Sequence, residues 1–356
     1  MMIGLGLATP GVSIEQSSAA TLANDIEGYE PAVARFARSI YAGSGVQRRA
    51  GVVLEATQAR GGIDAPLLRS GNGSGPGTAA RMDVYQVHAG TLAVQACLRA
   101  MADAGIDAST VTHLVTASCT GFCAPGVDHA VMRGVGLTPT SQRTHVGFMG
   151  CHAGVNALRV ARAFALSDPS AVVLVCCVEL CSLHFQSSTR ADAIVANALF
   201  ADGAAAAVVT GRPSTQGSMA VRSTASMLLP DSADAMAWNI GDFGFSMMLS
   251  SRVPALVEQH VRAWLEGWLA GQGMAVYDVA GWAVHPGGPK VLDAVGRALS
   301  LPAAAMDTSR AVLAEHGNMS SATVFFVLER LRKLRKLPAV VLAFGPGLHA
   351  EAALIG

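Results

Sequence analysis

The stretch Gly147-Phe148-Met149-Gly150-Cys151-His152-Ala153-Gly154-Val155 sets one cysteine between small residues at the start of an apolar helical run. Residues 144–149 before it are short and largely apolar, like the end of a strand, and apolar residues recur after it at helical spacing. Cys151 is therefore expected at a helix N-terminus, where the helix dipole and unpaired N–H groups lower the cost of a thiolate. Taken alone, such a cysteine is more often structural than reactive.

The composition indicates a large, well-buried protein. Of 356 residues, 51% are hydrophobic and 14% charged, so part of the apolar surface is expected to be covered by a second subunit. The 25 basic and 25 acidic residues cancel, which argues against nucleic acid as a partner. No apolar run reaches the ~18 residues of a membrane span, and residues 1–7 lack the basic segment of a signal peptide. All seven cysteines lie within residues 97–181, mostly in apolar runs, which favours reduced thiols and a cytoplasmic protein.

Buried-strand and helix patterns alternate along the chain, which predicts an α/β fold with mostly parallel sheets covered on both faces. Two glycine-rich breaks interrupt the pattern, at residues 61–77 and 211–218. The first is expected to be a surface loop. The second is expected to join an N-terminal half, residues 1–212, to a C-terminal half, residues 213–356.

A weak internal repeat relates the two halves. Cys151 opens a helix that leads into the strand 171–178, and Asn318 opens a helix, 319–334, that leads into the strand 339–343. A duplicated architecture brings such equivalent positions together near a pseudo-twofold axis.

A third residue with site character follows another expected strand. His285 lies in Trp282-Ala283-Val284-His285-Pro286-Gly287-Gly288-Pro289, whose glycines allow close approach of backbone to a ligand. Individually, His285 is more often a satisfied structural residue and Asn318 a helix cap. Together with Cys151 they form a nucleophile with two groups that stabilise an oxyanion or enolate.

Five separated motifs then resemble the type III polyketide synthases of the chalcone synthase-like family. They are Met149-Gly150-Cys151-His152-Ala153-Gly154, Ala198-Leu199-Phe200-Ala201-Asp202-Gly203-Ala204-Ala205, Val284-His285-Pro286-Gly287-Gly288-Pro289, Gly317-Asn318-Met319-Ser320-Ser321-Ala322 and Phe344-Gly345-Pro346-Gly347-Leu348. The resemblance implies the thiolase fold, a duplicated five-layer αβαβα architecture. It also implies a cytoplasmic homodimer that uses acyl-CoA and malonyl-CoA as substrates, without a metal or a tightly bound cofactor.

By the same resemblance, Cys151 carries the starter acyl group, while His285 and Asn318 promote decarboxylation of malonyl-CoA. The resulting enolate extends the chain, which then cyclises. Phe200 matches one gatekeeper between the CoA tunnel and the cavity, and Met247 stands at the second, where phenylalanine is common. The motifs that contain Ser320, Gly345 and Pro346 are expected to bind substrate beside these residues.

The nature of the starter depends on the residues that line the cavity. Thr120, Ala124 and Cys181 resemble the small lining residues of bacterial long-chain alkylpyrone synthases, which favours a medium- or long-chain fatty acyl-CoA and an alkylpyrone or alkylresorcinol product. Cys119 and Cys181 also resemble positions of tetrahydroxynaphthalene synthases, which start from malonyl-CoA. Trp238 is bulky enough to reduce the size of the cavity, so the alternative of a malonyl-CoA starter stays open.

For the CoA phosphates, Arg48 and Arg49 resemble a basic segment of the family, although a solvated surface pair fits them nearly as well.

Four other classes of protein fit less well. A thiolase needs a second cysteine in its C-terminal half, and none follows Cys181. A ketoacyl synthase III-like condensing enzyme shares the Cys, His and Asn set and is the nearest alternative. A papain-like hydrolase shares their order but not the residues around the cysteine. The spacing of Cys119, Cys123, Cys176, Cys177 and Cys181 is loosely compatible with zinc but lacks paired CxxC motifs.

Overall fold

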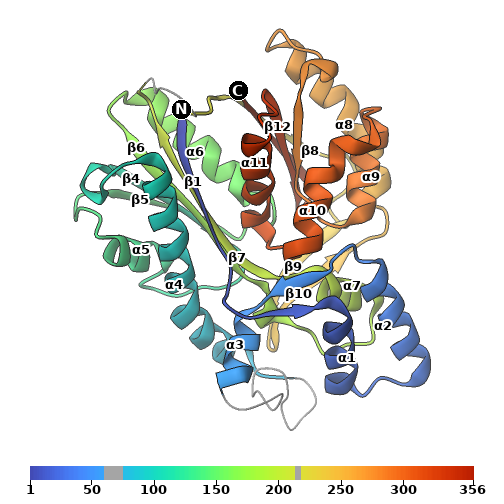
Figure 1. Cartoon of the computed structure of the whole chain (residues 1–356). Coiled ribbons are helices and arrows are strands. Elements are labelled where there is room, and N and C mark those ends of the chain that lie inside the picture. Colours follow the sequence, from blue (N-terminus) through green and yellow to red (C-terminus); the bar gives the residue numbers. More distant parts are fainter. Residues whose placement is uncertain (60–74, 213–217) are drawn as a thin grey trace.

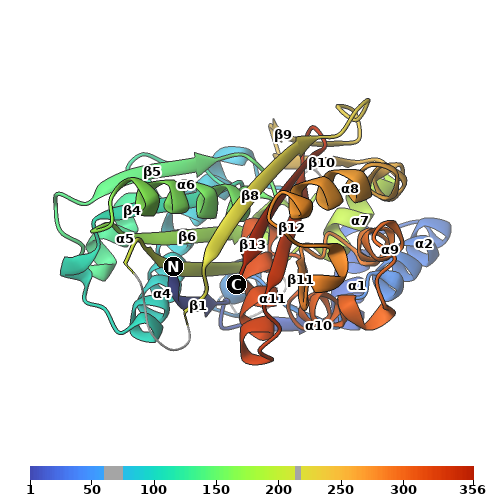
Figure 2. The same ribbon diagram turned by 90° about the horizontal axis from the view of Figure 1, so that it is seen from above.

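Two sheets form the frame of the protein, one from each half of the sequence. The computed structural model describes residues 1–59, 75–212 and 218–356. The first sheet has the strand order β1 (Met2–Ala8), β7 (Asp202–Thr210), β6 (Val172–Leu180), β4 (His113–Ser118) and β5 (Gln142–Gly147). The second has the order β11 (Gly281–Val284), β12 (Ala339–Gly345), β13 (His349–Ile355) and β8 (Val221–Leu228). Seen from above, the two sheets lie side by side with helices between them (Figure 2).

Helices cover both sheets in three layers (Figure 1). One apolar core joins α6 (Ala153–Ser167) and α11 (Thr323–Lys333) to the inner faces of both sheets. A second core joins α4 (Thr78–Ala104) and α5 (Val127–Val135) to the outer face of the first sheet. A third joins α8 (Val253–Ala270) and α9 (Pro289–Ala298) to the outer face of the second. The expected five-layer αβαβα arrangement is confirmed.

The expectation of mostly parallel sheets is wrong. Strand β4 runs parallel to β5 and β6, and β11 runs parallel to β12, whereas the pairs β1·β7, β6·β7, β12·β13 and β13·β8 are antiparallel. A strand covered on both faces is apolar throughout whichever way its neighbours run, so its composition does not reveal its direction. The tight turn after Gly345 forces β12 and β13 into a hairpin.

The central helices confirm the repeat with one difference. Helix α6 begins two residues after Cys151, as expected. The chain after Asn318 first makes a 3-10 turn, η5 (Ser320–Ala322), before α11 begins at Thr323. The two glycine-rich breaks lie largely outside the described residues.

A cap of smaller elements gathers at one end of the two sheets, at the bottom of Figure 1. Strands β4 and β11 point their carboxyl ends to this cap, so the loops after them enter it. The cap contains β2 (Ser13–Glu15), α1 (Gln16–Glu27), α2 (Pro31–Gly43), β3 (Arg48–Ala50), α3 (Val52–Ala59), η2 (Cys181–His184), α7 (Ala191–Leu199), β9 (Met236–Gly241) and β10 (Gly244–Leu249).

The remaining short elements are η1 (Ala108–Thr110), η3 (Val276–Asp278), η4 (Ala303–Met306) and α10 (Asp307–His316). Within the described ranges, none of the helices combines the length and the apolar character that crossing a bilayer requires.

Helix α4 packs so closely on β1 that a side chain at Gly6 has no room. A Cβ there would lie 2.1 Å from the carbonyl oxygen of Ala96, which is backbone and cannot move aside. We expect Gly6→Ala to lower the free energy of unfolding by about 1–3 kcal/mol, the usual cost of overpacking, measured by denaturant titration. Gly43→Ala is the matched control because nothing lies within 4 Å of its added methyl group. Equal stability of both variants would contradict the close packing.

Candidate active site

The turn that carries Cys151 is held in an unusual backbone conformation. Phe148 has φ 57° and Gly150 has φ 83°, and a Cβ at Gly150 would lie 2.3 Å from Cδ of Pro346. A left-handed conformation at a bulky residue such as Phe148 is rare and persists only where the surroundings enforce it, most often at functional sites. The N–H of Gly150 donates to Sγ of Cys119 over 2.9 Å. The turn thereby aims Cys151 at the cavity instead of continuing the strand.

Burial controls the protonation of Cys151. The residue is 7% exposed, and removal from water raises the pKa of its thiol to about 12. Hydrogen bonds from Ser320 and Asn318 lower this pKa, and the nearby Glu179 carboxylate raises it. Burial outweighs every group that lowers this pKa, including the hydrogen bond to the backbone N–H at the start of the helix. Cys151 rests as a thiol and needs a base.

His285 has the properties of such a base. It follows β11, and its N–H donates to the carbonyl oxygen of Leu342 over 2.7 Å. Its ring is 2% exposed, and neither ring nitrogen has a partner among the described residues. Burial, and next the neighbouring His152, lower the pKa of His285 to about 3. The ring therefore rests as a neutral imidazole with both nitrogens unpaired.

Asn318 is attached to the opposite half of the chain. Its N–H donates to the carbonyl oxygen of Leu199, and its own carbonyl accepts from the N–H of Ala201, both over 2.9 Å. Its Oδ1 accepts from the N–H of Ser320 over 2.8 Å, which leaves the amide NH2 as the donor toward Cys151. Asn318 and Ser320 are thus brought to Cys151. His285 lies near enough to His152, the residue after the cysteine, for the charge of that ring to lower its pKa. Its approach to Cys151 stays a prediction.

Glu179 is a site residue that the sequence reasoning missed. It is fully buried on β6 and accepts hydrogen bonds from the N–H of Cys119 at 2.9 Å, from the Thr120 hydroxyl at 2.9 Å, and from the Ser321 hydroxyl. Burial raises the pKa of its carboxyl group to about 7. The signal was present: Glu179 is the only charged residue in the apolar run 171–178 and its continuation to Leu180.

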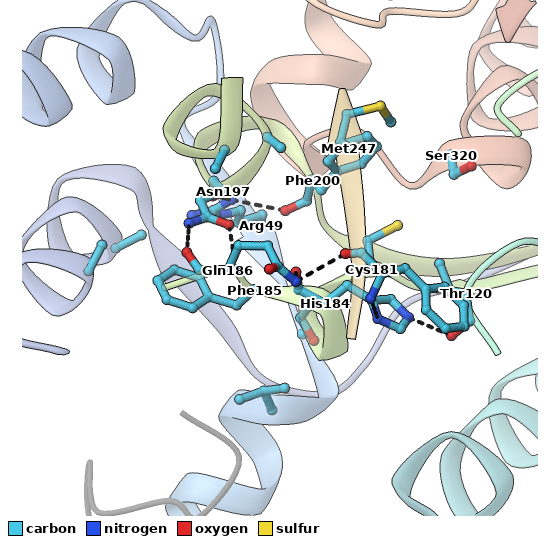
Figure 3. A pocket seen from close by; sticks show the side chains of 18 of the residues that line it. Arg49, Thr120, Cys181, His184, Phe185, Gln186, Asn197, Phe200, Met247 and Ser320 are labelled. Carbon is cyan, nitrogen blue, oxygen red and sulfur yellow. Dashed lines mark hydrogen bonds between the residues drawn. The ribbon is translucent and has the colours of Figure 1, made fainter. Parts of the chain in front are cut away.

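One continuous cavity runs from Cys151 into the cap. Figure 3 shows part of its wall, from Thr120 and Cys181 to Arg49 and Phe200. Its wall contains most of the residues expected to bind substrate, namely Cys119, Thr120, Cys181, Phe200, Trp238, Met247, Ser320 and Pro346. Trp238 and Met247 are paired across the β9–β10 hairpin, and the indole N–H donates to the carbonyl oxygen of Cys119 over 2.8 Å. The indole is therefore fixed and does not swing to close the cavity.

His184 is a second residue that the sequence reasoning missed. It stacks on Phe245 with ring centroids 4.1 Å apart. Its Nε2 lies 2.7 Å from the carbonyl oxygen of Thr120, and its Nδ1 accepts from the N–H of Phe245 over 3.0 Å. Burial lowers the pKa of His184 to about 4, so its ring is neutral. Through its two hydrogen bonds, the ring connects the loop after β4 to strand β10.

Three expected residues lie elsewhere. Ala124 is exposed and absent from the cavity wall of its own chain. Gly345 is also outside the wall and packs under His152, where a Cβ would lie 2.3 Å from the ring. Arg48 is exposed beside Glu315 and His316.

Arg49 does reach the cavity, where its side chain also binds backbone. Its Nη1 donates to the carbonyl oxygens of Asn197 and Phe200, the latter over 2.9 Å (Figure 3). This arginine binds backbone at the end of α7, including the carbonyl oxygen of Phe200. These bonds engage only Nη1 of its guanidinium group, so the expected role of Arg49 in holding phosphate stays a prediction.

Among the described residues, no group of three or more His, Cys, Asp or Glu side chains has the arrangement of a metal site, and all seven cysteines are free.

The comparison with known families decides the identity. The N-terminal domain of chalcone and stilbene synthases matches residues 64–213, and their C-terminal domain matches residues 220–356. The chain belongs to this family of type III polyketide synthases. It is therefore an acyl-transferring, decarboxylating condensing enzyme on the thiolase-like fold.

Named relatives agree with this assignment. The alpha-pyrone synthesis polyketide synthase-like Pks18 of Mycobacterium tuberculosis is 36% identical over 284 residues, which cover 77% of this chain and 72% of the relative. The 1,3,6,8-tetrahydroxynaphthalene synthase of Streptomyces peucetius is 38% identical over 271 residues, which cover 74% and 72%.

Solved structures agree as well. PKS-I from the brown alga Ectocarpus siliculosus superposes with a TM-score of 0.93 at 29% identity, covering 100% of this chain and 97% of its own. The C-terminal type III polyketide synthase domain of Steely1 from Dictyostelium has a TM-score of 0.91 at 28% identity, covering 99% and 98%.

The negative charge of Glu179 should reduce the fraction of Cys151 that is present as the reactive thiolate. Glu179→Gln keeps the shape and one acceptor oxygen but removes a negative charge that raises the pKa of Cys151. We expect iodoacetamide to alkylate Cys151 several-fold faster in this variant between about pH 7 and 9, because more thiolate is present. The measurement is the labelling rate of the Cys151 peptide by mass spectrometry. Glu258→Gln, at an exposed ion pair with Arg297, is the control, and a rate unchanged in both variants would rule out this influence.

Proposed function

We propose that the protein loads a medium- or long-chain fatty acyl group from CoA onto Cys151 and extends it with malonyl-CoA. His285 takes the proton of the Cys151 thiol, the sulfur attacks the acyl-CoA carbonyl, and the CoA thiolate leaves with a proton. Three features of the site support this step. They are the strained turn under the cysteine, the unpaired neutral ring of His285 and the donors on Asn318 and Ser320.

Extension uses the same residues in a second role. Malonyl-CoA loses carbon dioxide, and the electron pair of the broken bond forms an enolate whose oxygen is stabilised by N–H donors of His285 and Asn318. The enolate carbon attacks the Cys151 thioester, and the Cys151 sulfur leaves. A dry site suits this reaction, because hydrogen bonds to a developing charge are strongest away from water.

The length of the cavity is the observation that supports a long starter. Beyond Cys181 the cavity continues between α1, α2 and α7, along a wall of small and aliphatic side chains that we call the acyl arm. The arm is lined by Ile14, Ala19, Leu22, Ala23, Ile26, Tyr41, Val53, Leu54, Phe185, Ala193 and Ala196. An apolar channel of this kind matches an alkyl chain and has no function for a malonyl starter. We propose cyclisation to an alkylpyrone or an alkylresorcinol.

The principal alternative is a malonyl-primed synthase of tetrahydroxynaphthalene type. The relative from Streptomyces carries that name, and Cys119, Cys181 and Trp238 all line the cavity. An assay that compares octanoyl- and dodecanoyl-CoA with malonyl-CoA alone separates the long-chain reaction from the malonyl-primed one. The products are identified by mass. Products formed only from malonyl-CoA would refute the long-chain starter.

The same proposal includes a homodimer in the cytoplasm. Phe122 and Met149 are 46% and 41% exposed, and they flank the loop that carries Ala124. Large apolar side chains exposed together favour a partner surface, so a second copy is proposed to cover this loop. The reduced cysteines fit the cytoplasm. The halves 1–212 and 213–356 are proposed to be the two repeats of the duplicated fold.

The roles of Cys151 and Asn318 separate in two assays. Cys151→Ala should abolish acyl loading, measured as the mass added to the protein after incubation with dodecanoyl-CoA. Asn318→Ala should still load but decarboxylate malonyl-CoA at least about a hundredfold more slowly, because it lacks one donor to the enolate oxygen. Equal loss of loading in both variants would contradict these roles.

The acyl arm makes a further prediction about chain length. Ala23 is 4% exposed and lines the arm, so Ala23→Phe should fill it. We expect the ratio of kcat/KM for dodecanoyl-CoA over octanoyl-CoA to fall about tenfold or more, since the longer chain loses its space. Ser18→Phe, on the exposed side of the same helix, is the control. An unchanged ratio in Ala23→Phe would refute the assignment of the arm.

A further inference from the structure

The hydroxyl of Tyr41 is an unexplained polar group in the acyl arm. Tyr41 lies on α2, is 2% exposed and contributes to the cavity wall together with Ala19, Ala23 and Ile26. Its Oη is fully buried and has no hydrogen-bond partner among the described residues. A buried hydroxyl without a partner costs about 1–3 kcal/mol, so such groups are rare unless a ligand or a water completes them.

The neighbouring Arg49 lies close enough to this hydroxyl to lower its pKa, but no hydrogen bond of normal geometry joins the two groups. The guanidinium carbon of Arg49 lies 5.5 Å from the centre of the Tyr41 ring, over its face, and its Nη1 donates to two backbone carbonyls. Burial raises the pKa of Tyr41, so the phenol keeps its proton and remains a donor. The arm therefore presents a neutral O–H group among alanine and isoleucine side chains.

Two more unpartnered oxygens lie on the helix beside the arm. Asn24 and Glu27 each follow a lining residue of α1, Ala23 and Ile26, but neither belongs to the cavity wall. Asn24 Oδ1 and Glu27 Oε1 are both buried without a partner among the described residues. Glu27 is close enough for its charge to raise the pKa of Tyr41. Of these three polar atoms, only the Tyr41 hydroxyl belongs to a residue of the cavity wall, and a plain alkyl chain would leave it unsatisfied.

We propose that the acyl arm selects a starter chain that carries a hydroxyl group, and that Tyr41 is the residue that recognises it. The ligand hydroxyl accepts a hydrogen bond from Tyr41 Oη. This inference rests on the proposed long-chain acyl starter and deepens it, since it names the class of that chain. A site built to hydrogen-bond a hydroxyl discriminates against the analogue that lacks it, because the buried partner is then left unpaired.

The test compares matched acyl-CoA pairs on the full-length enzyme. Octanoyl-, decanoyl- and dodecanoyl-CoA are each paired with their ω-hydroxy derivatives, and kcat/KM with malonyl-CoA is measured for each. For the chain whose terminal hydroxyl reaches Tyr41, we expect kcat/KM to be about tenfold higher than for the unmodified chain of the same length. Tyr41→Phe keeps the volume and should abolish this preference. Tyr29→Phe is the matched control, because Tyr29 already donates to the carbonyl oxygen of Ser188 over 3.2 Å and lies outside the cavity wall.

Thermal stability provides a second readout. Removal of an unpartnered hydroxyl should leave Tyr41→Phe as stable as the parent or more stable, whereas Tyr29→Phe loses a hydrogen bond and should be less stable. Provided that the unmodified chains are still extended, two outcomes would overturn the inference. One is that no hydroxylated chain is preferred at any length, and the other is that the preference remains in Tyr41→Phe. Destabilisation by Tyr41→Phe with no change in preference would mean that a buried water completes the hydroxyl. If no aliphatic chain is loaded at all, the proposed function itself fails.

Discussion

Two backbone hydrogen bonds between the halves of the chain are the constraint on which the site depends. They join Asn318 to Leu199 and Ala201, and so connect the start of the α11 segment to the end of α7. The same short bridge positions Phe200 at the gate and Ser320 beside Cys151. Because both segments continue into the central core, the packing of α6 and α11 between the sheets holds the bridge in place.

Desolvation then determines the chemistry of the groups that this frame brings together. It raises the pKa of Cys151 to about 12 and that of Glu179 to about 7, and lowers the pKa of His285 to about 3. Each group is shifted toward its neutral form, which is the least costly state in a dry site. Charge is therefore introduced mainly by the reaction, where fixed donors stabilise it without the reorganisation that water would need.

The residues around Cys151 are packed tightly, whereas the acyl arm that extends into the cap is open. Around Cys151, glycines at 150 and 345 let Pro346 and His152 pack against the backbone, with no space for another side chain. In the acyl arm, small residues leave a channel, and the buried hydroxyl of Tyr41 remains without a partner among the described residues. A rigid centre suits a reaction common to the whole family. An open arm suits the recognition of one particular starter.

The sequence by itself determined the family and the α/β class, and it singled out Cys151, His285 and Asn318 as the proposed catalytic residues, because each lies in a contiguous motif at the end of a regular element. It also predicted the five layers, through the resemblance to the family. Only the tertiary structure decided the strand directions, the placement of Ala124 and Arg49, the protonation of Cys151, and the roles of Glu179, His184 and Tyr41. Those properties depend on which distant groups meet and on how completely water is removed from them, and neither is encoded in local spacing.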